Sequence, residues 1–137
     1  MKLPLIFRWI CGAAVLGVLL VGGCILTDDT PTYSELKASC DEVLSKSPNS
    51  AALDTWLKAN RISSQRVAGP LDESFKGILV SNGISGSNAK RAASCTYFDG
   101  LHVRGGLLST HVAYGYFVFA SDGSLIDHSI HDIYYGM

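Results

Sequence analysis

THVAYGYFVFAS at residues 110–121, DG at 122–123 and SLIDHSIHDIYY at 124–135 form the stretch that decides the fold. The first segment is rich in valine and aromatic residues, which favour strands. Asp-Gly between two such segments is a strong signal for a tight hairpin turn. We therefore expect a long antiparallel hairpin to end the chain.

A two-residue turn at Asp122-Gly123 would give this hairpin one apolar face and one half-polar face, because side chains alternate along a strand. The apolar face would carry Ala113, Phe117, Phe119, Ile126 and Ile130, and the other face Tyr114, Tyr116, Asp127, Ser129 and His131. A bulged three-residue turn would shift one strand by a position and change this assignment. The sequence leaves both turns open.

The segment from Thr32 onward predicts two short helices. Thr32 has the spacing of a capping box with the glutamate three residues later, and apolar residues then recur with a helical period. This predicts a helix near 33–46, with Cys40 on its buried face. A second apolar stripe predicts a helix near 51–59, with Asn60 as a left-handed end.

Between these helices and the hairpin, the pattern is shorter and more broken. Phe75 to Val80 is predicted as a first strand, Ser81 to Asn88 as a loop, and Cys95 to Val103 as a strand or an irregular segment. The order predicts an α+β fold, in which two short N-terminal helices pack on a small antiparallel sheet of three to four strands ending in a long hairpin. We expect residues 33–137 to be a single small domain.

The N-terminal residues have a different composition. Lys2 and Arg8 are followed by an uncharged apolar run, then by Val21-Gly22-Gly23 and Cys24. This order resembles the signal peptide and lipobox of bacterial lipoproteins, in which small residues precede the cleaved bond. The resemblance implies that residues 1–23 are a signal peptide, that Cys24 is lipidated, and that 24–32 form a tether.

The resemblance also implies an address. Ile25 instead of aspartate after the lipidated cysteine would imply release to the outer membrane, with the domain facing the periplasm. The alternative is a retained inner-membrane anchor, because Trp9 to Leu26 is 18 residues without a charge, about the shortest length that spans a bilayer. Both alternatives export the C-terminal domain.

Charge and cysteine content narrow the function further. Eleven basic residues against twelve acidic ones give a net charge of −1, and no basic stripe indicates nucleic-acid binding.

Outside the leader and the lipidation site, Cys40 and Cys95 remain as an even pair. In an oxidising compartment we expect them to form a disulfide, and two buried free thiols are the alternative.

The sequence contains no convincing catalytic or metal site. Asp127 to Asp132 is dense in carboxylates and imidazoles, but His128 and His131 would point to opposite faces of a strand. Ser109 or Ser129 could supply a hydroxyl for hydrolysis, yet no Gly-x-Ser-x-Gly motif occurs. We expect no enzyme, no cofactor and no bound metal.

Protein binding is the function that the remaining residues favour. The tyrosines are apolar on one side and polar on the other, as interface residues often are. The candidate binding residues are Tyr114, Tyr116, Tyr134 and Tyr135. Cross-strand stabilisation of the sheet is the alternative role for these rings.

The Cys24 lipobox, the helix over Ser50 to Asn60 and the hairpin segment 117–125 together resemble small SmpA/OmlA-type outer-membrane lipoproteins. That resemblance implies an unidentified envelope protein as partner and a role in envelope assembly or maintenance. A lipoprotein inhibitor or immunity protein, acting on an envelope-attacking enzyme or toxin and presenting the loop at 81–88, is the alternative.

Overall fold

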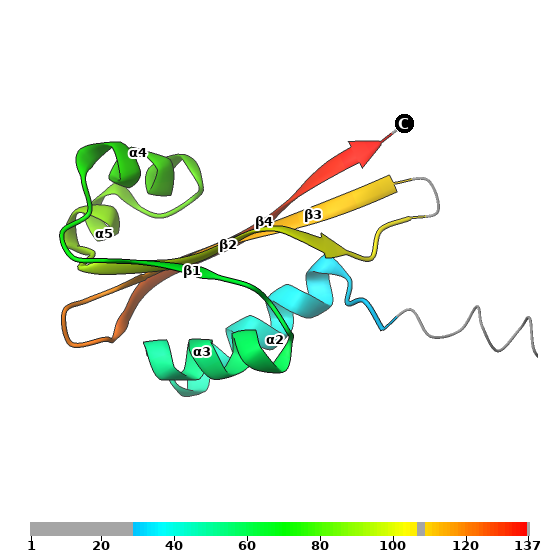
Figure 1. Ribbon diagram of the computed structural model, residues 1–137, viewed down its shortest axis with the longest axis horizontal. Helices are drawn as coiled ribbons and strands as arrows, with labels where there is room; N and C mark the ends of the chain where they lie inside the picture. Colours follow the sequence, from blue (N-terminus) through cyan, green and yellow to red (C-terminus); the bar gives the residue numbers. More distant parts are fainter. Residues whose placement is uncertain (1–28, 107–108, 137) are drawn as a thin grey trace, which may run out of the picture.

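The computed structural model describes residues 29–106 and 109–136, which form a four-stranded antiparallel sheet with helices on both faces (Figure 1). The strands lie in chain order and are β1 (Gln65–Ala68), β2 (Ser94–Val103), β3 (Ser109–Phe119) and β4 (Leu125–Gly136). On the lower face lie α2 (Tyr33–Lys46) and α3 (Ser50–Ala59), and on the upper face α4 (Glu73–Ser81) and α5 (Gly86–Arg91). The expected α+β fold ending in a hairpin is confirmed.

The helices of the lower layer form where the sequence predicts them. The Thr32 hydroxyl accepts a hydrogen bond from the Glu35 N–H at 3.3 Å, and the Glu35 carboxylate accepts one from the Thr32 N–H at 2.8 Å, which completes the capping box. The buried faces of α2 and α3 meet the sheet in a lower cluster that includes Leu36, Leu53, Trp56, Phe98, Phe117 and Phe119. Each large side chain buried there contributes about 1.5–3 kcal/mol, so this cluster holds both short helices on the sheet.

The end of α3 differs by one residue from the prediction. Asn60 follows the helix with φ −91°, and the next residue, Arg61, takes the left-handed conformation with φ 55°. The Asn60 side chain instead donates to the Trp56 carbonyl at 2.8 Å. The asparagine therefore ends the helix through its amide and not through its backbone conformation.

The segment before β2 does not follow the prediction. The strand expected at 75–80 lies in α4, and the loop expected at 81–88 contains the last residue of α4 and the start of α5. The Asp72 carboxylate accepts from the Phe75 N–H at 2.7 Å and so begins α4. Leu79, one turn after Phe75, is buried in an upper cluster with Leu71, Ile84, Ala89, Cys95 and Val118. The strand prediction is wrong because Phe75 and Leu79 lie one helical turn apart on the face that meets this cluster, whereas the β-branched Ile78 and Val80 are exposed.

The predicted hairpin forms, with the bulged turn of the two alternatives. Backbone hydrogen bonds close a three-residue turn in which Gly123 has φ 83°. Phe119 consequently pairs with Leu125, and an irregularity at the next pair restores the expected register. Leu125 therefore packs against the lower cluster, whereas Ile126, expected there, packs in the upper one.

Gly115, in the middle of β3, makes room for an aromatic ring. It pairs with Phe98 of β2, and both residues are buried. A Cβ atom at position 115 would lie 2.3 Å from Cε1 and 2.6 Å from Cζ of Phe98, well inside contact distance. The Phe98 ring therefore lies directly over the glycine backbone, which explains a glycine in a strand interior.

Cys40 and Cys95 are free thiols in this structure, so the expected disulfide is not formed. Cys40 belongs to the lower cluster and Cys95 to the upper one, so the sheet lies between them. Burial raises the pKa of Cys40 to about 12 and that of Cys95 to about 11. Both thiols therefore act as small apolar core residues, which is the alternative role that the sequence left open.

The expected signal peptide, the lipobox and Cys24 lie outside the described residues. Among the described helices, none has both the length and the apolar character that crossing a bilayer requires.

Candidate binding face

A row of stacked aromatic rings crosses the upper face of the sheet. It starts at α4 with Phe75, whose ring centroid lies 6.1 Å from that of Tyr97 on β2. Tyr97 stacks on Tyr116 of β3 at 5.9 Å, and Tyr116 stacks on His131 of β4 at 6.2 Å. His131 also stacks on Tyr114 at 5.5 Å. We call these five residues the aromatic row. Strand alternation places Tyr97, Tyr114, Tyr116 and His131 on one face, and Phe75 reaches that face from α4.

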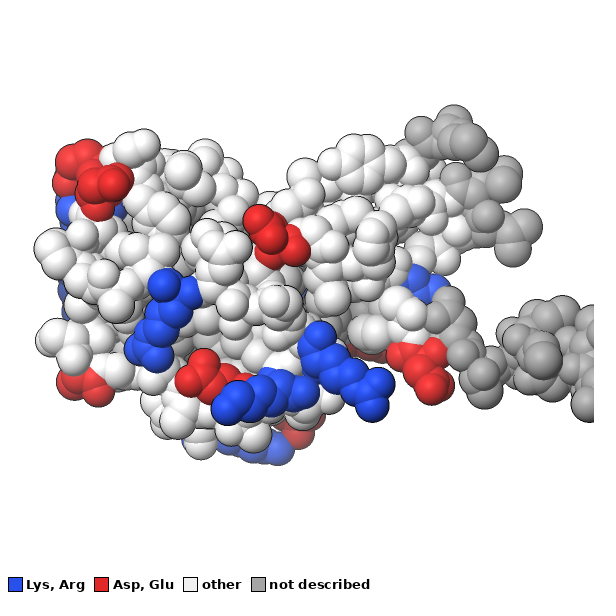
Figure 2. All heavy atoms as spheres, viewed as in Figure 1, with Lys and Arg blue, Asp and Glu red and all other residues white. Residues whose placement is uncertain are grey.

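The helices of the upper layer cover only one half of this face. In Figure 1, α4 and α5 lie over the end of the sheet near the β3–β4 turn, and the other end of the hairpin projects beyond them. Ile133 and Tyr135 on the projecting part are 41% and 56% exposed. We call Tyr114, His131, Ile133 and Tyr135 the open face. Figure 2 shows charged side chains mainly along the helical lower side and few on the projecting hairpin.

The tyrosines of the open face are linked to one another and to the covered half. The pKa of Tyr114 is raised because its hydroxyl hydrogen-bonds that of Tyr135 and, to a smaller extent, through burial. The pKa of Tyr116 is raised by burial and then by the negative charge of Asp99. The hydroxyls of Tyr114 and Tyr116 therefore stay protonated at neutral pH, and each keeps hydrogen-bonding capacity for a partner.

The structure divides the four tyrosines predicted from the sequence. Tyr114, Tyr116 and Tyr135 share the upper face, whereas Tyr134 lies on the lower face, where its ring meets that of His111 edge-on at 5.1 Å. Neighbouring residues of a strand cannot share a face, so Tyr134 and Tyr135 never belong to one strip. The sequence analysis missed Tyr97. It placed His131 on the face of Tyr114 and Tyr116, which is correct, but it did not include His131 among the binding residues. The period-two alternation of side chains along β2 and β4 was the sequence signal that points to Tyr97 and His131 as members of this face.

Two neighbouring residues of the segment at 127–132, Asp127 and His128, connect β4 to the two helical layers; we call this pair the clasp. Asp127 accepts from the Ser85 N–H at 3.1 Å and from the Asn88 side chain at 3.0 Å, both at the start of α5. On the other face, His128 Nε2 contacts the Asp41 carboxylate of α2 at 2.8 Å. Adjacent residues of β4 therefore hold the two helical layers.

The pKa values of the two carboxylates in these contacts, Asp127 and Asp41, are lowered by their hydrogen-bond partners. Burial alone would raise the pKa of Asp127, but hydrogen bonds from Asn88, Ser85 and His128 outweigh it and lower the pKa. Burial likewise opposes ionisation of Asp41, whose pKa is lowered by hydrogen bonds from His128 and Lys37. Both groups are therefore ionised in the folded protein at neutral pH.

The arrangement does not bring metal ligands together. His128 and His131 lie on opposite faces, as alternation predicts. In the part of the chain that the structure describes, no three His, Cys, Asp or Glu side chains form a group that could hold a metal ion.

The serine and histidine candidates for hydrolysis are also engaged elsewhere. His111 Nδ1 contacts the Asp132 carboxylate at 2.9 Å, which is the kind of pair that orients a catalytic base. The nearby Ser109 hydroxyl, however, accepts from the Gly106 N–H at 2.9 Å. Within residues 29–106 and 109–136, no hydrogen bond joins a serine hydroxyl to His111.

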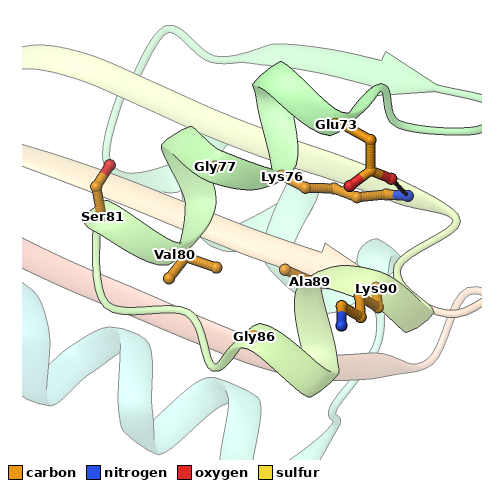
Figure 3. Close-up of a pocket in the computed structure, with 8 residues that line it drawn as sticks. All are labelled: Glu73, Lys76, Gly77, Val80, Ser81, Gly86, Ala89 and Lys90. Carbon is orange, nitrogen blue, oxygen red and sulfur yellow. Dashed lines mark hydrogen bonds and ion pairs between the residues drawn. The ribbon is translucent and has the colours of Figure 1, made fainter.

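A groove of about 420 Å³ lies between α4 and α5 (Figure 3). Its walls are built mainly from small or apolar side chains, and Lys76 at its margin is held by Glu73 at 2.7 Å. The lining residues are Glu73, Lys76, Gly77, Val80, Ser81, Gly86, Ala89 and Lys90. Its volume lies at the lower end of the range of about 300–1,000 Å³ usual for ligand sites. The groove is large enough for a small apolar group, and the acid in its lining, Glu73, is paired with Lys76 at its margin.

Comparisons with protein families, with curated proteins and with solved structures found no match. The resemblance to small outer-membrane lipoproteins thus stays a prediction from the order of the sequence elements.

Proposed function

We propose that this chain is a lipid-anchored protein of the bacterial envelope, attached through Cys24 and facing the periplasm, that acts by binding another protein. The outer membrane is the favoured location because Ile25 follows the lipidated cysteine. The contact surface is the open face of the sheet, and the role is in envelope assembly or maintenance.

The aromatic row is the observation that supports protein binding. Its half-buried rings contact one another from α4 across three strands, so Tyr114 and His131 at its open end are held in place before a partner arrives. Tyrosines held in this way lose little conformational entropy on binding and offer both apolar area and a hydroxyl. Tyr135 lies beside the row on the open face and is 56% exposed, so its ring is accessible to a partner.

The inhibitor alternative receives less support. It required residues 81–88 as a free loop that enters an enzyme. That segment is largely helical or held against β4, because Asp127 accepts from both Ser85 and Asn88.

The anchor is tested by the intact mass of the chain extracted from bacterial membranes. We expect the mass of residues 24–137 plus a diacylglycerol and an acyl chain. A full-length unmodified mass would replace the lipid anchor with a single inner-membrane span and would remove the argument for the outer membrane.

The contact surface is tested by photo-crosslinking in intact cells. A photoreactive residue at Tyr114 or Tyr135 should give the same discrete adduct, and one at Lys58, which is exposed on α3, should not. Identical adducts from all three positions, or none from either tyrosine position, would refute binding through the open face. Adducts from the tyrosines to a secreted hydrolase or toxin would instead favour the inhibitor.

A further inference from the structure

β4 forms one edge of the sheet and is the long edge, with 12 residues against four in β1. The direction of its backbone groups follows from alternation. The Phe119 carbonyl accepts from Ala93 N–H at 2.8 Å, on the side away from β4. Every second residue back along β3, including Gly115, therefore faces β2. The partner of Gly115 in β4 is Ile130, so the backbone groups of Ile130 point out from the sheet edge.

The first half of this edge is closed by bonds from the same chain. The Leu125 N–H donates to the Pro48 carbonyl at 2.8 Å. The His128 N–H donates to the Asp127 side chain at 2.9 Å, and the Tyr33 hydroxyl donates to the Ile130 carbonyl at 2.7 Å. These bonds confirm that 128 and 130 face outward, and each occupies one of the two backbone groups that another strand would need at that residue.

The second half of the edge is open. By the same alternation, the N–H and C=O groups of Asp132, Tyr134 and Gly136 point outward, and those of Asp132 and Tyr134 have no hydrogen-bond partner among residues 29–106 and 109–136. Three of the five large hydrophobic side chains exposed in that described part lie here: Ile133 at 41%, Tyr134 at 62% and Tyr135 at 56%. β4 contains no proline or lysine, the residues that commonly protect an edge. The Asp132 carboxylate is turned away to His111.

We propose that residues 131–135 of β4 pair antiparallel with the same segment of a second copy of this chain, about a two-fold axis at Ile133. In this register, the outward groups of Asp132 in one copy meet those of Tyr134 in the other, and the reverse pairing follows by symmetry. Four backbone hydrogen bonds form, Ile133 faces Ile133, and no carboxylate opposes another.

The self-complementary side chains around Ile133 are the reason to choose a second copy. In this register Ile133 packs on Ile133, each Asp132 lies opposite Tyr134 and not opposite the other Asp132, and Gly136, which also faces outward, lies beyond the paired segment. The joined sheet also brings the open faces of both copies side by side, because Tyr135 of each copy then pairs with His131 of the other. The inference therefore extends the contact surface of the proposed function but does not depend on the lipid anchor.

Cysteine cross-linking of the full chain tests the register. In a non-hydrogen-bonded antiparallel pair, Cα atoms lie about 4.5 Å apart, within the range of about 4.4–6.8 Å that a disulfide spans. Ile133→Cys should therefore cross-link to itself on mild oxidation. Tyr135→Cys is the matched control: its two copies would be four residues out of register, roughly 13 Å apart at about 3.3 Å per residue. The unmodified chain sets the background from the native cysteines.

We expect at least tenfold more cross-linked dimer from Ile133→Cys than from Tyr135→Cys. Equal yields from the two variants, or a yield at background from Ile133→Cys, would overturn the proposal. A second measurement does not rely on cysteine: the unmodified chain in detergent should have the mass of two copies by sedimentation. A single-chain mass at micromolar concentration would likewise overturn it, and a single chain that takes up an added extended peptide would assign the edge to another partner.

A proline at position 134 tests the hydrogen bonds themselves. Tyr134→Pro removes an outward N–H and leaves the β3–β4 ladder intact, since proline is tolerated at such edge positions. Arg66→Pro is the matched control, because Arg66 pairs with Thr96 and faces outward on the opposite edge by the same alternation. With unchanged circular dichroism, Tyr134→Pro should abolish the Ile133→Cys cross-link and Arg66→Pro should preserve it. Cross-linking that survives Tyr134→Pro would refute the edge pairing.

Discussion

Gly115→Ala is the substitution whose effect is best determined by the structure. The new Cβ would lie 2.3 Å and 2.6 Å from two ring atoms of Phe98, so the ring must move. Phe98 is only 2% exposed and packs in the lower cluster against Phe117, at a centroid distance of 6.2 Å, so its movement disturbs other side chains. Overpacking of this kind costs about 1–3 kcal/mol, and the depth of this clash places the expected loss of unfolding free energy near 3 kcal/mol.

A loss of that size is large for a domain of this length. At about 4–8 °C per kcal/mol, we expect the Tm to fall by roughly 12–24 °C. The measurement is thermal and urea unfolding of residues 29–137, monitored by circular dichroism. Gly77→Ala is the matched control: it adds the same methyl group in α4 with nothing within 4 Å, and should be neutral or stabilising by up to about 1 kcal/mol.

Phe98→Leu tests whether the clash is the cause. Leucine lacks the outer ring atoms, so in that background Gly115→Ala should cost less than about 1 kcal/mol, which gives a coupling energy of at least about 2 kcal/mol between the two sites. An unfolding free energy of Gly115→Ala within about 0.5 kcal/mol of the unmodified protein would refute the packing argument. So would an equal loss in both backgrounds.

Three further predictions concern single groups. Folding lowers the pKa values of Asp127 and Asp41. The stability that these carboxylates contribute is therefore present above the ordinary carboxyl pKa of about 3.9 and is lost as the pH falls through their lower folded pKa values. Urea unfolding between pH 5 and pH 2 should show this loss of stability, and Asp127→Asn should make the loss smaller. Cys40 and Cys95 should react with a thiol reagent only after the protein is unfolded, and prior reduction should not change the rate. If the unfolded, unreduced protein did not react, the two cysteines would form a disulfide. Thr96→Val should stabilise the domain by about 1 kcal/mol in urea unfolding, because the buried Thr96 hydroxyl has no hydrogen-bond partner among the described residues. A loss of stability would show that this hydroxyl does make a hydrogen bond.

The elements predicted correctly from the sequence are those with two agreeing local signals. α2 has a capping box followed by a helical apolar stripe, and the hairpin has β-rich segments around Asp-Gly. α4 was misassigned because Ile78, Leu79 and Val80 favour a strand, and the competing cap at Asp72 received no weight. β1 was missed because its four residues contain one half-buried apolar side chain, Val67, and gain their structure from pairing with β2.

The candidate site was predicted only in part, for a geometric reason. Tyrosine as an interface residue was a sound inference, but choosing tyrosines by type joined Tyr134 to Tyr135 across two faces. The expected bridge between Cys40 and Cys95 failed similarly, since an even count of cysteines says nothing of which side of the sheet each occupies. Which half of the upper face stays open depends on where α4 and α5 settle, and no local pattern encodes that placement.

The clasp at Asp127 and His128 also bears on how the chain is made. Both residues that hold the helical layers belong to the last strand, so they leave the ribosome or a translocation channel after every element they fasten. Until then, α2 and α3 have only β2 and an incomplete sheet to cover the side chains of the lower cluster. A chain that stops before β4 would expose that surface permanently, and we expect it to aggregate or to bind chaperones that shield apolar segments.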